Sequence, residues 1–322
     1  MLQRTDPTIK WLLAAGNPSV RYFTLTELFD VPIHALEVAK TLRAIEDSIQ
    51  IRTLLAGQRP DGGFGPRPYQ KWHGAHWRLV SLVELGVPAG FPPAIAATGH
   101  LLSWLESGVH YLVPKKIKRL WRCHASIPGN ALAVCCRLGL AKDSRVKRLA
   151  VLLLETQWPD GGWNCDPSPA AHHSSFHESL SPLWGLAEYW RATRNPDARI
   201  AAHGAAELFL RHHLFLSDRT GRIMDRRWLV PHYPPYWHYD IFQALLVLSR
   251  FGPLSDPRVS PALDVVEQKR RPDGRWNSGQ RYWRPAREKS TKPVEVLDWG
   301  RRGPNKMVTL NALRILKAAG RL

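Results

Sequence analysis

A short segment that occurs three times constrains the fold of this chain more than any other feature. It reads Gln-Trp-Pro-Asp-Gly-Gly-Trp at residues 157–163, Gln-Arg-Pro-Asp-Gly-Gly-Phe at 58–64, and Gln-Lys-Arg-Arg-Pro-Asp-Gly-Arg-Trp at 268–276. Pro-Asp-Gly is typical of a tight turn, because proline presets φ, aspartate accepts from nearby backbone amides and glycine adopts a positive φ. Three copies, each after an apolar run and ending on an aromatic residue, predict a helical repeat protein.

Apolar residues at helical spacing divide the chain into two alternating sets of predicted helices. The first set covers residues 20–29, 73–85, 130–140, 173–190, 238–251 and 305–319. The second covers residues 8–15, 35–56, 93–105, 144–156, 198–212 and 258–268. Each copy of the repeated segment lies between a helix of the second set and the next helix of the first set. We expect Pro182 to kink its helix or to delay its start.

Six helical hairpins of similar length can bury their apolar faces by stacking. An open stack needs a polar face at each end, and residues 307–316 lack one. We therefore expect an all-α fold, an α6/α6 toroid that forms a closed ring and a single domain over residues 1–322, with residues 8–29 beside residues 305–319. The linkers 108–129, 216–237 and 277–304 are long, and we expect them to cover one rim of the ring.

Composition excludes several classes of protein. The 322 residues carry a formal net charge of +18, but arginine is distributed along the whole chain, which favours a basic surface over a nucleic-acid interface. No apolar run reaches the roughly 18 residues of a membrane span, and the first residues do not resemble a signal peptide. Four cysteines, two of them adjacent, do not indicate a disulfide framework. We expect a reduced, cytoplasmic protein; whether it needs a partner subunit is open.

The segment Gln-x3-Gly-x-Trp at residues 157–163 resembles the QW motif of squalene and hopene cyclases. The repeats as a whole resemble the terpenoid cyclase and protein prenyltransferase superfamily, and most of all a smaller bacterial group described as squalene-cyclase-like. The resemblance implies an α/α toroid with a central cavity. The chain departs from the family in lacking both the Asp-x-Asp-Asp acid of the cyclases and the Asp-Asp-x-x-Asp magnesium motif.

Protein prenyltransferases hold zinc between an Asp-x-Cys and a Tyr-x-His at consecutive inner-helix starts. Tyr236-Trp237-His238 resembles the second element and places His238 at the ligand histidine. His173-Ser174-Ser175 stands at the first element, with Cys165 a few residues upstream. His173 and His177 lie four apart on one helix face, so a zinc site of Cys165, His173, His177 and His238 follows, since thiolate and imidazole ligands favour zinc. The alternative is that these histidines bind no metal and serve as hydrogen-bonding groups, acids or bases.

In a closed toroid the N-termini of the inner helices meet at one rim, where their partial positive charges attract anions. We expect His177, Glu178 and Asp240 to be the acid–base residues there. The residues that we expect to bind substrate are His73, His76, Trp77, Asn130 and Trp237. Cys123 and His124 can reach the same rim, but we rank them below Cys165. Asp61, Asp160 and Asp273 belong to the turns, and Phe64, Trp163 and Trp276 are predicted plugs between helices.

Two functions follow from this arrangement. The first is an enzyme that acts, with or without zinc, on an isoprenoid-like or other partly apolar small molecule with an anionic head. The second is a non-catalytic protein that binds a lipid or a small polyanion in the same cavity. A carbohydrate-processing toroid is less favoured, because it needs paired carboxylates and histidine dominates here.

Overall fold

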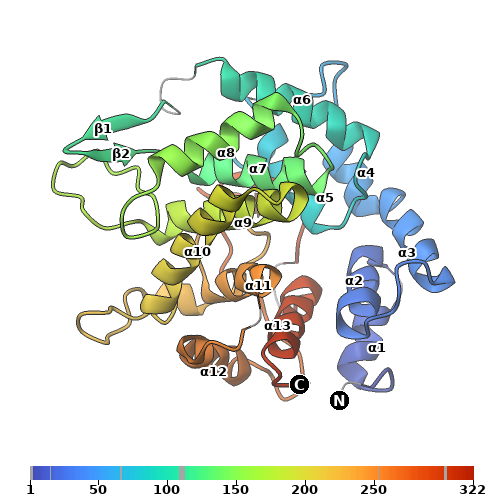
Figure 1. The fold of residues 1–322 in the computed structure, drawn as a ribbon. Coiled ribbons are helices and arrows are strands. Elements are labelled where there is room, and N and C mark those ends of the chain that lie inside the picture. Colours follow the sequence, from blue (N-terminus) through green and yellow to red (C-terminus); the bar gives the residue numbers. More distant parts are fainter. Residues whose placement is uncertain (1–2, 15, 66, 109–112, 253, 301–302) are drawn as a thin grey trace.

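Helices dominate the computed structural model, which describes residues 3–14, 16–65, 67–108, 113–252, 254–300 and 303–322 (Figure 1). The α-helices are α1 Pro7–Leu13, α2 Pro18–Phe23, α3 Leu36–Glu46, α4 Ile49–Leu55, α5 Ala75–Glu84, α6 Pro92–Glu106, α7 Ser126–Arg137, α8 Ser144–Thr156, α9 Phe176–Thr193, α10 Pro196–Arg211, α11 Ile241–Phe251, α12 Ser260–Gln268 and α13 Lys306–Ala318. A π-helical segment, Thr24–Leu28, continues α2, and 3-10 turns cover Arg226–Leu229 and Pro257–Val259. Within the described residues, no helix is both long enough and apolar enough to span a bilayer.

Two of the long linkers contain short strands that the sequence pattern did not predict. β1 Lys115–Ile117 pairs antiparallel with β2 Leu120–Arg122, and β3 Arg284–Pro285 pairs parallel with β4 Val294–Glu295. The prediction of a mostly helical chain is confirmed, while these two small sheets are additions to it.

The predicted helix over residues 35–56 is wrong in one respect, because it is two helices. α3 ends at Glu46, and α4 begins at Ile49 after a break. Ser48 caps the second helix, since its hydroxyl accepts from the backbone N–H of Ile51 at 3.3 Å. Apolar spacing alone does not show this break. The capping serine is the residue in the sequence that indicates it.

α7 begins at Ser126, four residues before the predicted start, because a side chain from another helix caps it. The carboxylate of Glu178 on α9 accepts from the N–H of Ser126 at 2.8 Å. Pro182 lies inside α9, which continues through it. The two helices approach closely there: a side chain at Gly129 of α7 would stand 2.4 Å from the backbone nitrogen of Pro182.

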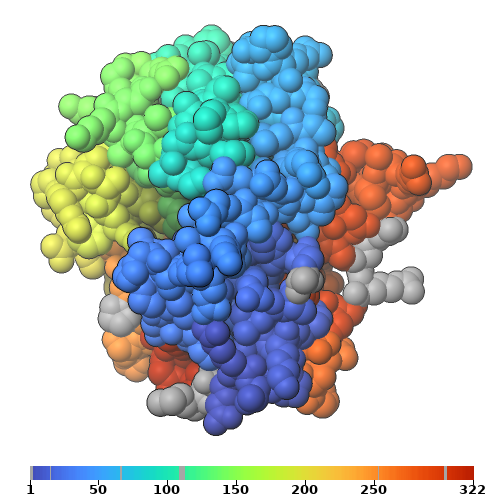
Figure 2. Space-filling model, turned by 90° about the vertical axis from the view of Figure 1, so that its right-hand side faces the viewer, coloured from blue at the N-terminus to red at the C-terminus, as the bar shows by residue number. Residues whose placement is uncertain are grey.

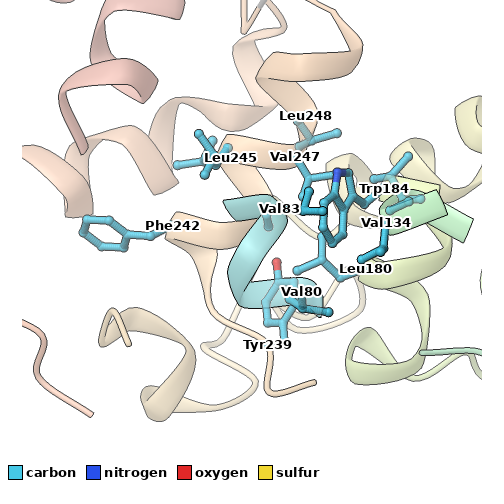
Figure 3. Packing of buried hydrophobic residues seen from close by; sticks show 14 of the residues in the cluster. Val80, Val83, Val134, Leu180, Trp184, Tyr239, Phe242, Leu245, Val247 and Leu248 are labelled. Atoms are coloured by element: carbon cyan, nitrogen blue, oxygen red, sulfur yellow. The ribbon is translucent and has the colours of Figure 1, made fainter. Parts of the chain in front are cut away.

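From α5 onward, neighbouring helices of the first predicted set pack against one another in chain order. α5 contacts α7, α7 contacts α9, α9 contacts α11, α11 contacts α13, and α13 returns to α2 and its π-helical continuation. Apolar side chains from these helices form one buried cluster, and Figure 3 shows Val83, Val134, Trp184 and Val247 from α5, α7, α9 and α11 within it. The helices of the second set flank them, each in contact with a first-set neighbour.

The two ends of the chain lie side by side, as the predicted ring requires. Figure 1 shows α1 and α2 next to α13. The guanidinium of Arg314 on α13 donates to Glu27 at 2.6 Å, and Lys317 bonds to Asp30 at 2.5 Å. Residues 8–29 and 305–319 are therefore packed together by ion pairs as well as by apolar contact.

The three repeated turns use their residues in matching ways. The Gln157 amide donates to Gly161 O at 2.7 Å in its own turn and to Ala201 O of α10 at 2.8 Å; Gln58 does the same with its own turn and with α6. The aspartates accept backbone N–H groups two residues ahead. The glycine after each aspartate has a positive φ and lies against the next second-set helix, so a side chain there is excluded twice.

Trp163 and Trp276 close their turns with the same two hydrogen bonds. The backbone N–H of each donates to a hydroxyl, Ser179 on α9 or Thr309 on α13, at 3.0 Å. Each indole N–H donates to a carbonyl ten residues upstream in the preceding helix, at 3.1 Å and 2.7 Å respectively. Both rings are almost fully buried, which supports their role as plugs between helices.

The first repeat carries Phe64, whose side chain has no N–H. The hydrogen bond that the indole makes in the other two repeats is made here by Arg78. Arg78 Nη1 donates to Leu54 O, again ten residues upstream of the aromatic plug, at 2.8 Å. Its guanidinium carbon lies 4.1 Å from the centre of the Phe64 ring. Arg78 is the fourth residue of α5, as Ser179 and Thr309 are the fourth residues of α9 and α13. The first repeat therefore keeps the hydrogen bond to the carbonyl ten residues upstream, with arginine as the donor in place of an indole.

Residues of the linkers 216–237 and 277–304 pack over the start of α5. Trp283 packs with Trp72, Trp77 and Tyr236 in a separate buried cluster, which we call the aromatic cap. The N–H of Trp72 donates to Val294 O at 3.1 Å. Figure 2 shows the corresponding surface, where the orange-red residues near 280–300 border the light-blue residues near 60–75.

Candidate functional site

Three side chains of the kinds that can ligate a metal meet at the starts of α7 and α9. A nitrogen of His124, the sulfur of Cys165 and a carboxylate oxygen of Glu178 all lie within 4.8 Å of one another. We call these residues the metal-ligand cluster; in the part of the chain that the structure describes, it is the one group of three or more such side chains at this spacing. It unites Cys165, a predicted ligand, with Glu178, a predicted acid–base residue, and His124, which we had ranked lower.

Backbone pairing between distant segments brings the cluster together. The N–H of Cys123 donates to Asn164 O at 3.0 Å, which sets His124 beside Cys165. Arg122 then holds the loop that follows, since its guanidinium donates to Ser168 O at 3.1 Å and Ala171 O at 3.0 Å. Glu178 is oriented by its bond from the Ser126 N–H, which occupies one carboxylate oxygen and leaves the other facing His124 at 3.8 Å.

The electrostatics of the cluster favour a positive charge at His124. Hydrogen bonding to Cys165, followed by hydrogen bonding to Glu178, raises the pKa of His124 to about 10 although partial burial opposes this. The protonated imidazole of His124 thus stands between the sulfur of Cys165 and the carboxylate of Glu178. A divalent ion in place of that proton would give a site with no net charge, because its two charges balance the thiolate and the carboxylate while histidine binds neutral.

The other predicted zinc ligands do not join Cys165. His173 is exposed, and its ring lies 4.1 Å from that of His172. His177 accepts from the N–H of Tyr239 through Nδ1 at 2.9 Å, and burial lowers its pKa. His238 is stacked between two rings, with centroids 3.4 Å from Tyr282 and 3.9 Å from Trp237. The structure therefore disperses a ligand set that the sequence had placed together.

Asp240, a predicted acid–base residue, is fully buried and pairs with a histidine that the sequence reading missed. Its carboxylate lies 2.5 Å from His232 Nδ1. It also accepts from the N–H of His232 at 3.0 Å and caps α11 through the N–H of Gln243 at 2.8 Å. The side-chain nitrogen of Gln243 stands 2.6 Å from His232 Nε2. All polar atoms of this pair are engaged, so Asp240 fixes the loop before α11.

A cavity lies among α5, α7, α9, α11 and α13, below the loop of residues 231–238; we call it the central cavity. The cavity has a volume of about 50 Å³. Asn130, a predicted substrate-binding residue, lines it, as do Trp237 and His238. A buried ion pair between Glu84 and Arg250, 3.0 Å apart, forms another part of the wall.

The remaining predicted substrate-binding residues lie away from the central cavity. His76 and Trp77 are buried beside one another, and burial lowers the pKa of His76 to about 3. Trp77 belongs to the aromatic cap. His73 lines an open groove with the basic residues Arg67, Lys71, Arg284 and Lys292. Part of the positive charge of the chain therefore gathers where the linker of residues 277–304 crosses the start of α5.

The residues that sequence reasoning missed have weak local signals. His232 lies in a proline-rich linker, and only the burial of Asp240 reveals its role. Tyr233 and Arg250 line the central cavity although nothing in their spacing marks them. Comparison with protein-family models, with curated proteins and with solved structures found no match for this chain.

Proposed function

We propose that this chain is an α6/α6 toroid enzyme that binds zinc at the metal-ligand cluster and acts on a small, partly apolar molecule with an anionic head. The observation that carries the proposal is the convergence of His124, Cys165 and Glu178 within 4.8 Å. Three protein ligands of this kind leave the fourth position of a tetrahedral zinc ion open for water or substrate. Zinc in such a site lowers the pKa of a bound water and polarises a bound carbonyl.

The ring closure is supported by the three repeated turns. The first turn, at Gly62, lies against α6, and the second, at Gly161, lies against α10. The third, at Gly274, lies against α1 at the other end of the chain, where the Thr8 hydroxyl donates to Asp273 O at 3.2 Å. The last repeat thus contacts the first as each earlier repeat contacts its successor, which is what a closed ring of hairpins requires.

The position of the cluster relative to the central cavity supports an enzymatic role. Asn130 follows Ser126 by four residues on α7, and Ser181 follows Glu178 by three residues on α9; both Asn130 and Ser181 line the cavity. Along α9, Glu178 is therefore about one helical turn from a residue of the cavity wall.

Elemental analysis of protein purified without an affinity tag or chelator tests the zinc site. We expect about one zinc ion per chain, and cobalt loaded in its place should give a thiolate charge-transfer band that Cys165→Ser abolishes. His124→Ala should weaken binding at least tenfold, because losing even a group that only orients a metal ligand costs such sites 10- to 100-fold in affinity. His173→Ala, a neighbouring histidine outside the cluster, is the matched control and should bind normally. Affinity should fall on acidification, since the ligands must lose protons.

Absence of stoichiometric metal, together with no cobalt band, would refute the zinc proposal. The contact of His124 with Cys165 then favours a second function, in which the thiolate of Cys165 is a nucleophile and His124 its proton partner. Alkylation by iodoacetamide distinguishes the two, because a metal-free thiolate reacts at neutral pH and slows in His124→Ala, whereas a zinc-bound thiolate is protected. If the protein neither binds metal nor shows alkylation of Cys165 that depends on His124, the remaining function is non-catalytic binding of a ligand in the cavity.

A further inference from the structure

The central cavity holds several buried polar atoms that have no protein partner within the described residues. They are Asn130 Nδ2, Tyr233 Oη, Trp237 Nε1, His238 Nδ1 and Arg250 Nε. Asn130 and Tyr233 are each 4% exposed, so bulk water does not satisfy them. A buried polar group that makes no hydrogen bond costs roughly 1–3 kcal/mol, so five around one cavity indicate that ordered water or the polar group of a ligand meets them there.

These unpartnered atoms are mainly hydrogen-bond donors. The amide nitrogen of Asn130, the indole nitrogen of Trp237 and Arg250 Nε can only donate. Tyr233 Oη can donate as well, and His238 is neutral at physiological pH because burial lowers its pKa to about 2. None of the unpartnered atoms that line the cavity, among the residues described, is an obligate acceptor. The missing partner must therefore supply acceptor oxygens.

The charge and size of the cavity narrow the class of ligand. The one fully ionised basic group in its described wall, Arg250, already bonds to Glu84 through its two terminal nitrogens, at 3.0 and 3.3 Å. A phosphate dianion would find no free cation here, whereas a carboxylate can be held by neutral donors. The rest of the wall is apolar, including Leu180, Phe242 and Val308, and the free space admits few heavy atoms.

We infer that the central cavity binds a small monocarboxylate, with the carboxylate held by Asn130, Trp237 and Arg250 and a short apolar tail against α9, α11 and α13. This inference rests on the proposed function in taking the cavity as the substrate site, and it makes the anionic head a carboxylate. A long isoprenoid chain does not fit the space that the structure leaves.

Titration of the full chain with straight-chain carboxylates from acetate to hexanoate, each matched by the alcohol of the same length, tests the inference. The indole N–H signal of Trp237 in tryptophan-labelled protein reports occupancy, and Trp237→Phe assigns that signal. We expect saturable binding of one or more carboxylates at millimolar concentration and no binding of the alcohols. Asn130→Leu and Trp237→Phe should each weaken affinity about 10- to 100-fold, as expected for the loss of one hydrogen bond to a charged acceptor. Isothermal titration calorimetry measures the affinity of Trp237→Phe, which lacks the indole signal, and of wild-type protein alongside it.

Trp228→Phe is the matched control. Trp228 Nε1 is also buried without a partner in the described part of the chain, but it does not line the cavity, so its loss should leave carboxylate affinity unchanged. A carboxylate bound only to a metal ion would be lost in Cys165→Ser and unaffected by Trp237→Phe, which separates failure of this inference from failure of the zinc site. Equal binding of alcohols, or no saturable carboxylate binding in wild-type protein, would overturn it.

Discussion

Replacing Arg78 by serine should expose how the first repeat compensates for its phenylalanine. Arg78 donates to Leu54 O and His73 O at 2.8 Å and to Ala56 O at 3.0 Å. The bond to Leu54 is buried and the other two are partly buried. In Arg78→Ser these carbonyls at the end of α4 and the start of α5 lose their donor.

The size of the effect follows from those three bonds. A carbonyl left buried without a partner costs about 1–3 kcal/mol, and the two partly buried carbonyls recover some of this from water. Loss of the guanidinium over the Phe64 ring adds about 0.5–1 kcal/mol. We expect Arg78→Ser to lower the free energy of unfolding by about 3–5 kcal/mol.

A second substitution should rescue the first. In Phe64→Trp/Arg78→Ser, the indole N–H can donate to Leu54 O and the serine hydroxyl can accept from the backbone of residue 64, as Trp163 and Ser179 do in the second repeat. We expect the double variant to regain about 2 kcal/mol relative to Arg78→Ser. Phe64→Trp alone should destabilise, because the larger ring meets the guanidinium that already covers Phe64.

Urea unfolding followed by tryptophan fluorescence, with m-values compared across variants, measures these free energies. The coupling between the two positions is obtained from the double-mutant cycle. Additive effects, or a loss below about 1 kcal/mol in Arg78→Ser, would refute the idea that arginine replaces the indole donor.

Two further predictions concern stability. Trp163→Ala should cost about 3–5 kcal/mol in the same unfolding assay while the metal content stays that of wild type; an unchanged melting temperature would contradict its role as a plug. His76 should make the protein less stable in acid. Its pKa in the folded protein, about 3, lies below the ordinary value of 6.5. Its contribution to the free energy of unfolding is therefore fully present above pH 6.5 and is lost as the pH falls toward 3. At pH 5 this loss is about 2 kcal/mol relative to neutral pH, and His76→Leu should remove it whereas the exposed His173→Leu should not.

The repeated turns could be predicted because their causes are local. Proline, aspartate and glycine in one segment determine the turn through φ preferences and bonds that span two residues. The helices could be predicted for a related reason, since apolar spacing reports which face is buried. Helix starts were less certain: α7 begins early because Glu178, from another helix, caps it, and no pattern within residues 126–140 records that bond.

The grouping of residues in the metal-ligand cluster could not be predicted from spacing along the sequence. Its three side chains come from the segment after β2, the second repeated turn and the first turn of α9, and the pairing of Cys123 with Asn164 is what unites them. Spacing along the sequence favoured His173 and His177 as neighbours on one helix face, but α9 begins only at Phe176, so His173 lies in the loop before the helix and is exposed, whereas His177 bonds to Tyr239. Residue types and turn chemistry thus determined which groups were available. Only the packing of distant segments decided which of them meet, because a metal site depends on distances in space and these are set by contacts between segments far apart in the chain.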